Sequence, residues 1–109
     1  ACINGFTNHR WNGITTLHFA RICHGIIKKG IKLPHIQHII PGNVISKDNL
    51  LKTIAKEFKR DDVIIKNMEA PVNIDRTLST ENAKLNNKLW QLAGYDKPPT
   101  IQQMIRELA

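Results

Sequence analysis

Four segments of this sequence place apolar residues at helical spacing, and turn-forming residues separate them. The spacing predicts helices over about residues 15–29, 46–58, 80–93 and 100–108. The expected helix signals are N-caps at Thr15, Ser46, Thr80 and Thr100, a capping box from Thr100 to Gln103, and stops at Gly30 and Gly94. The expected buried side chains are Phe19, Ile22, Cys23, Ile26 and Ile27, then Leu50, Leu51, Ile54, Ala55 and Phe58, then Leu85, Leu89, Leu92 and Ala93, and finally Ile101, Met104, Ile105 and Leu108.

Strands are short and few in this pattern. Residues 35–40 and 63–66 are expected as strands, residues 72–78 as an extended stretch, and residues 1–14 as a loop. The predicted fold class is mixed α/β, with about four helices and two or three short strands in one domain spanning residues 1–109. Since so few strands make a poor free-standing sheet, we expect the unit to pack beside something larger or to form a homo-oligomer.

Neither a membrane span nor a leader segment is visible in the sequence. The longest apolar runs are only a few residues, whereas a span needs about 20. The chain begins with Ala1 and no basic segment leads into an apolar run, so we expect a processed chain, an excised domain or a fragment. Cys2 and Cys23 are too few for a disulfide scaffold, which is compatible with the cytoplasm.

The charge balance narrows the expected partners. The sequence has 16 Lys and Arg residues against 9 Asp and Glu residues, a formal net charge of +7. Such an excess attracts anions, namely nucleic acid, nucleotides, phosphosugars or acidic membranes. The alternative is a solvated basic surface on one part of a longer protein.

Several self-contained active sites are excluded. The glycines at positions 5, 13, 25, 30, 42 and 94 build neither a G-x-G-x-x-G loop nor a P-loop. Tyr95 is the only tyrosine and Pro99 stands four places after it, so the chain has no Tyr-x-x-x-Lys pair. His35 and His38 would point to opposite faces of a strand, which is wrong for a shared metal ion. We therefore predict no catalytic residue and no metal ligand in this chain.

Two segments do carry the side chains of a binding site. Residues 7–13 combine hydrogen-bond donors, a cation and Trp11 in one expected loop, where function concentrates. The alternative is a turn that Trp11 anchors in the core. Residues 75–80 place Arg76 and the hydroxyls of Thr77, Ser79 and Thr80 before a predicted helix, whose free N–H groups attract phosphate. The alternative there is ordinary capping by Thr80 and a surface pair between Asp75 and Arg76.

These same segments resemble the C-terminal part of extended short-chain dehydrogenases, in particular dTDP-4-dehydrorhamnose reductase-like nucleotide-sugar reductases. The similar residues are Asn8-His9-Arg10-Trp11-Asn12-Gly13-Ile14-Thr15-Thr16-Leu17 with Phe19-Ala20, and Asp75-Arg76-Thr77-Leu78-Ser79-Thr80 with Leu85, Leu89-Trp90, Ala93-Gly94-Tyr95 and Pro98-Pro99-Thr100-Ile101. The resemblance covers nearly the whole chain, and none of its motifs is a catalytic signature.

The resemblance implies a role in substrate binding. In that family a Rossmann domain carries the glycine-rich cofactor loop and the catalytic Tyr-x-x-x-Lys, and this chain has neither. NAD(P)H is implied for the parent protein, with no cofactor bound by this chain. The implied ligand is a dTDP- or UDP-linked 4-keto sugar in polysaccharide precursor biosynthesis. Arg76 matches an arginine that contacts the substrate diphosphate, Thr77 and Ser79 add hydrogen bonds, and Trp11 with Asn12 line the sugar side.

Two other functions stay open. A small basic nucleic-acid-binding domain is supported by the lysine face of the second predicted helix, formed by Lys47, Lys52, Lys56 and Lys59. The lack of a base-reading Arg/Asn/Gln cluster and the few aromatic residues speak against it. A protein-interaction module with an exposed apolar flank is the other alternative.

Overall fold

The computed structural model describes residues 2–34 and 36–109. Its elements are β1 (Cys2–Phe6), β2 (His9–Trp11), α1 (Thr16–Lys29), β3 (Ile45–Ser46), α2 (Lys47–Glu57), β4 (Ile64–Met68), β5 (Ile74–Arg76), α3 (Ala83–Leu92) and α4 (Ile101–Leu108). This mixed α/β arrangement of four helices and a few short strands confirms the predicted coarse fold class. Ala1 and His35, which the sequence analysis also considered, lie outside the described residues.

The helices begin and end largely where local signals predicted. The hydroxyl of Thr15 accepts a hydrogen bond from the His18 backbone N–H at 3.1 Å, and Gly30 closes α1 in the left-handed conformation. Thr100 likewise accepts from the Gln103 N–H at the start of α4. The prediction that Thr80 begins the third helix is wrong. Asn82 caps α3 by accepting from the Leu85 N–H, because Asn is a stronger cap than Thr.

The buried stripe of each helix is narrower than predicted. The core consists of Ile22, Ile45, Leu89, Trp90, Ile101, Met104 and Ile105. Several side chains expected inside are exposed instead, namely Phe19, Ile27, Ile54, Phe58 and Leu108. The reason is the elongated shape, with extents of 46 × 30 × 18 Å and a radius of gyration of 15.7 Å. A compact domain of this length has a radius of gyration of about 13 Å.

Two small sheets organise the N-terminal residues that were predicted as a loop. β1 pairs in parallel with β4, while β2 lies between the antiparallel β3 and the parallel β5. The loop prediction for residues 1–14 is wrong because these strands pair with partners far along the chain, which local patterning does not show. Gly5 is required there: a Cβ at Gly5 would lie 2.8 Å from the Asp48 Cβ of α2.

The predicted strand at residues 35–40 is also wrong, since residues 36–40 form no strand. Side chains of α3 hold this segment instead. Asn86 accepts from the Ile40 N–H at 3.0 Å, and the Ile40 carbonyl accepts from Asn86 Nδ2 at 3.2 Å and from Trp90 Nε1 at 2.8 Å. The segment is therefore extended, but its backbone partners are side chains.

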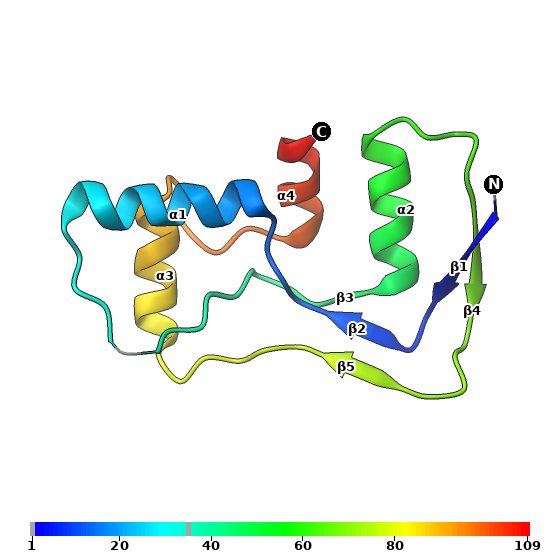
Figure 1. Ribbon diagram of the computed structural model, residues 1–109, viewed down its shortest axis with the longest axis horizontal. Helices are drawn as coiled ribbons and strands as arrows, with labels where there is room; N and C mark the ends of the chain where they lie inside the picture. The colour runs from blue at the N-terminus through cyan, green and yellow to red at the C-terminus, as the bar shows by residue number, and fades with distance from the viewer. Residues whose placement is uncertain (1, 35) are drawn as a thin grey trace.

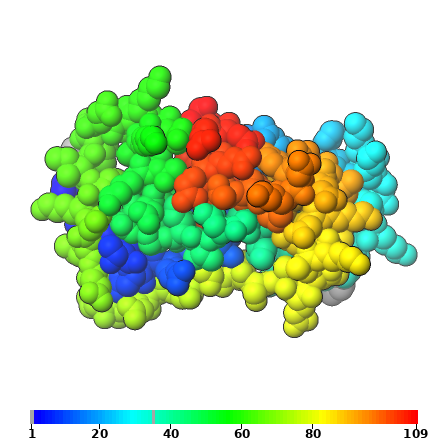
Figure 2. All heavy atoms as spheres, turned by 180° about the vertical axis from the view of Figure 1, so that it is seen from behind, coloured from blue at the N-terminus to red at the C-terminus, as the bar shows by residue number. Residues whose placement is uncertain are grey.

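The molecule has two ends joined by the β3-β2-β5 sheet. Figure 1 shows α1 packed against α3 at one end and α2 packed against the β1–β4 pair at the other. From behind, Figure 2 shows α4 (red) between the α2 side (green) and α3 (orange and yellow). Three of the core residues, Ile101, Met104 and Ile105, belong to α4. The second predicted motif, at residues 75–80, leads from β5 in the central sheet towards α3 at the helical end.

Candidate functional site

The two motifs of the candidate site meet in the central sheet. β2 and β5 pair in parallel, with Trp11 opposite Arg76. Residues directly opposite each other in a parallel pair point to the same face of the sheet. The structure therefore brings together two site residues that are widely separated in the sequence.

Arg76 ends β5 with its side chain exposed. Within the described part of the chain, its guanidinium has no ion-pair or hydrogen-bond partner. The expected alternative, a surface pair with Asp75, does not form. The Asp75 carboxylate instead accepts from the Thr77 N–H at 3.0 Å, and the hydrogen bonds from Thr77, together with nearby Arg10, lower the pKa of Asp75. Arg76 is thus a cation available to an anionic ligand.

Trp11 joins this site to the core. Its indole is half-buried and packs against the core cluster. Gly13 lies so close that a Cβ there would stand 2.1 Å from the Trp11 ring. The anchoring role left open by the sequence is therefore present, and it fixes the position of the strand that lies beside Arg76.

Asn8 and Asn12 clamp the two ends of β2 to the chain beyond. Asn12 is only 4% exposed, and its amide donates to the Leu78 carbonyl at 2.7 Å and accepts from the Leu78 N–H at 2.6 Å. Asn8 makes the same pair of bonds with Ala70, at 2.9 and 2.8 Å. Asn12 therefore positions the segment that carries Arg76. The sequence pattern could not predict either pair of bonds, because the partners of Asn8 and Asn12 are backbone atoms more than sixty residues away.

Ser79 and Thr80 do not lie with Arg76 and Trp11. They line a separate hollow with a volume of about 430 Å³. Its lining residues are Pro34, Ile36, Gln37, His38, Ser79, Thr80, Glu81 and Asn82. Since α3 begins only at Ala83, the predicted phosphate site at a helix N-terminus directly after Arg76 is not formed. Arg76 and Thr77 lie with Trp11 and Asn12, whereas Ser79 lines the other hollow.

A polar network between α1 and α4 was missed by sequence reasoning. Tyr95 and Arg21 both donate to Glu107 Oε1, at 2.5 and 2.8 Å, and Arg21 also donates to the Tyr95 hydroxyl at 2.7 Å. His18 lies fully buried beside them, with Nε2 3.5 Å from Glu107 Oε1 and Nδ1 bonded to the Thr15 hydroxyl. Burial raises the pKa of Tyr95. Burial lowers the pKa of His18, and this effect outweighs the attraction of the Glu107 carboxylate, which acts in the opposite direction. The network links the two helices, with His18 buried and Arg21 and Glu107 partly open to solvent.

We expect this buried histidine to make folding sensitive to mild acid. Because its pKa is lowered by burial, the neutral imidazole of the folded state contributes stability fully above the ordinary pKa of 6.5, and that stability is lost as pH falls towards the folded-state pKa. Urea unfolding between pH 7.5 and 5.5 should show a falling free energy of unfolding. His18→Gln should flatten this dependence, whereas His24→Gln, at an exposed position of α1, should not. An unchanged slope in His18→Gln would contradict the expectation.

Comparisons with protein-family models, curated proteins and solved structures found no match. No helix in the described part of the chain is both long and apolar enough to cross a membrane. Residues 2–34 and 36–109 also contain no group of three or more His, Cys, Asp or Glu side chains arranged to hold a metal ion. A function for this chain is therefore inferred from the sequence resemblance and from the chemistry of the β2–β5 site, which consists of Trp11, Asn12, Arg76 and Thr77.

Proposed function

We propose that this chain is the nucleotide-sugar-binding C-terminal part of an NAD(P)H-dependent 4-keto-sugar-nucleotide reductase. The proposed type is dTDP-4-dehydrorhamnose reductase-like, acting in the cytoplasm in polysaccharide precursor biosynthesis. One observation carries the proposal: the two motifs of the resemblance, distant in sequence, pair in β2 and β5 and place Arg76 opposite Trp11.

The chemistry of Arg76 suits a diphosphate. A guanidinium offers a planar fork of donors that binds two phosphate oxygens at once, and Arg76 has no competing partner among the described residues. Trp11 would border the sugar side, while Asn12 acts through Leu78 by holding the chain that carries Arg76 and Thr77. Ser79 would reach the ligand only from the neighbouring hollow.

The hydride chemistry is assigned to the Rossmann domain. NAD(P)H supplies the hydride in such reductases, and the residues of this chain do not fit that cofactor. The two glycines with positive φ, Gly30 and Gly94, both end helices and form no phosphate-binding loop.

An open sheet face supports a neighbouring domain. The β1–β4 pair is parallel, and parallel sheets are normally covered on both faces. Gly5 faces α2 on one side, whereas Ile64 and Met68, on the strand positions of the opposite face, are 64% and 42% exposed. The exposed Asn4 and Lys66 lie on the same face, paired with each other between these two apolar side chains. We propose that the Rossmann domain covers this exposed face, which also fits the elongated shape of the chain.

Amide-shift NMR with a dTDP-sugar tests the proposed binding site. Arg76→Ala should weaken binding by about tenfold or more, because a bidentate charged contact is lost. Arg10→Ala is the matched control: Arg10 neighbours Trp11 in β2 but points to the opposite face, so its loss should change the Kd less than about twofold. Equal effects of the two variants, or an unchanged Kd in Arg76→Ala, would refute the assignment.

A further inference from the structure

A basic hollow is lined by residues of the second half of α2, of the turn that follows it and of the start of β4. Figure 1 shows that this end of α2 lies away from β5, the strand that carries Arg76. It has a volume of about 540 Å³. Its lining residues are Lys52, Ala55, Lys56, Lys59, Arg60, Asp61, Val63 and Ile65. The hollow is open to solvent, and its volume lies within the range of about 300–1,000 Å³ that is typical of small-molecule sites.

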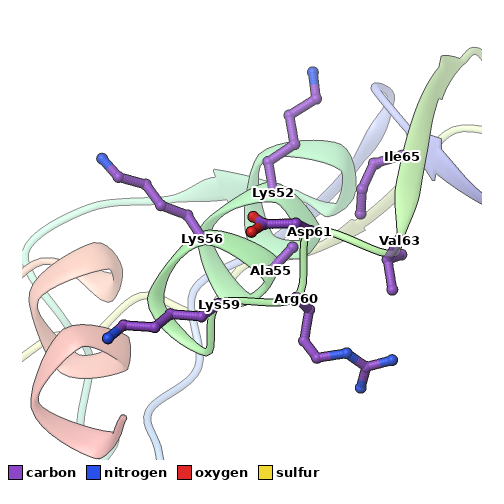
Figure 3. A pocket seen from close by; sticks show the side chains of 8 residues that line it. All are labelled: Lys52, Ala55, Lys56, Lys59, Arg60, Asp61, Val63 and Ile65. Atoms are coloured by element: carbon purple, nitrogen blue, oxygen red, sulfur yellow. The ribbon is translucent and has the colours of Figure 1, made fainter.

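The hollow combines an apolar floor with a cationic rim. Ala55, Val63 and Ile65 are half-buried and form the floor. Figure 3 shows the lysine and arginine side chains spread around it, with the Asp61 carboxylate between Lys52 and Lys56. The rim therefore carries four cationic side chains and one carboxylate, and the charged ends of the four cations point outward from the hollow. Lysine side chains are long and flexible, so they can turn towards an anion placed over the floor.

The carbonyl groups at the end of α2 accept hydrogen bonds from backbone N–H groups and do not depend on the cations of this rim. Backbone donors already bond three carbonyls near the end of α2: the Phe58 N–H bonds to Ile54 at 3.0 Å, the Arg60 N–H to Ala55 at 2.8 Å and the Lys59 N–H to Lys56 at 3.2 Å. A helix C-terminus carries a partial charge of only about −0.5, which four cations exceed. Lys52 pairs with Asp48 at 3.7 Å and Arg60 with Asp62 at 2.9 Å. Among the described rim residues, Lys56 and Lys59 are therefore the cations without an ion-pair partner.

Lys59 occupies a backbone position that favours glycine. Its φ is 55°, and it is the only non-glycine residue with positive φ in the described part of the chain. Glycine is the usual residue at this place in such a helix end, because it has no Cβ to clash. A lysine there keeps a cation on the rim at a conformational cost, and such strained residues cluster at ligand sites.

We propose that this hollow is a second binding site, for a nucleoside phosphate. The planar base would lie on the apolar floor of Ala55, Val63 and Ile65, and Lys56 and Lys59 would pair with the phosphates. Inorganic phosphate alone would use only the rim. The site shares no residue with the β2–β5 site, so it stands independently of the proposed nucleotide-sugar function.

Amide-shift titration of the whole chain with ADP and with pyrophosphate tests the proposal. ADP should shift the amides of residues 55–65 and bind more tightly than pyrophosphate, because only ADP contacts the floor. The double variant Lys56→Gln/Lys59→Gly should weaken ADP binding by about tenfold or more. Glycine at position 59 suits the backbone there, so this variant keeps the helix end. The control Lys28→Gln/Lys29→Gln removes the same charge from the end of α1 and should have less than about a twofold effect.

Val63→Ser separates the floor from the rim, and should weaken ADP binding while leaving pyrophosphate binding unchanged. Equal affinity for ADP and pyrophosphate would overturn the nucleoside part of the proposal. Equal losses in the two double variants would show attraction by net charge alone. A short DNA duplex that binds more tightly than ADP, with the same dependence on Lys56 and Lys59, would instead identify a surface for the nucleic-acid backbone. ADP binding that depends on Arg76 and not on Lys56 would belong to the β2–β5 site and would also overturn the proposal.

Discussion

Trp90→Ala is expected to lower the free energy of unfolding by about 4 kcal/mol, the largest effect of any substitution considered. Trp90 is fully buried at the centre of the core and meets the Tyr95 ring edge-on at 5.5 Å. Its indole N–H also holds the Ile40 carbonyl, so the variant loses both ring packing and one of the bonds that attach residues 36–40 to α3. For a domain whose total stability is about 5–15 kcal/mol, such a loss brings unfolding close to ambient conditions.

Urea unfolding followed by circular dichroism measures this loss. Trp90→Phe keeps most of the ring volume and removes the N–H, so it should cost about 1–2 kcal/mol. Phe19→Ala, at a site that is 52% exposed, should cost less than about 1 kcal/mol and is the matched control. A loss in Trp90→Ala no larger than the Phe19→Ala value would mean that Trp90 does not hold the helical end together.

Asn12→Ala is expected to lower the free energy of unfolding by about 2 kcal/mol and to loosen the segment that carries Arg76. The substitution deletes the buried Asn12 amide and with it two hydrogen bonds to the Leu78 backbone. Hydrogen exchange at the Leu78 amide should accelerate. If Arg76 binds a diphosphate, nucleotide-sugar affinity should fall with it, because the guanidinium is then less well placed.

Asn8→Ala provides the control for this effect. Asn8 clamps Ala70 with the same two bonds at the other end of β2, so its removal should cost a comparable amount of stability. It should leave Leu78 exchange and nucleotide-sugar affinity nearly unchanged. If both variants weakened binding equally, the loss would reflect general destabilisation, and Asn12 would have no positioning role.

The helix ends were predicted well because their signals are local. Thr15 and Thr100 each bond to an N–H three residues away, so the residue type and its place before an apolar repeat are sufficient. The N-cap of α3 was predicted two residues early, because Thr80 and Asn82 are both capping residues and Asn82, the stronger cap, begins the helix. The strand predicted at residues 63–66 is confirmed by β4, and the extended stretch predicted at 72–78 contains β5. The strands β1 and β2 were missed, because β1 pairs with β4 and β2 with β5 across more than sixty positions.

The sequence by itself determined which side chains the candidate site has: an arginine beside hydroxyls in one segment, and an aromatic, amide-rich segment in another. Only the tertiary structure decided that Arg76 lies opposite Trp11, that Asn12 faces the Leu78 backbone rather than a ligand, and that Ser79 belongs to a different hollow. The physical reason is the range of the interactions involved. Capping and side-chain charge act within a few residues, whereas strand pairing and the Asn8 and Asn12 clamps join backbone groups that only the folded chain brings within hydrogen-bond distance.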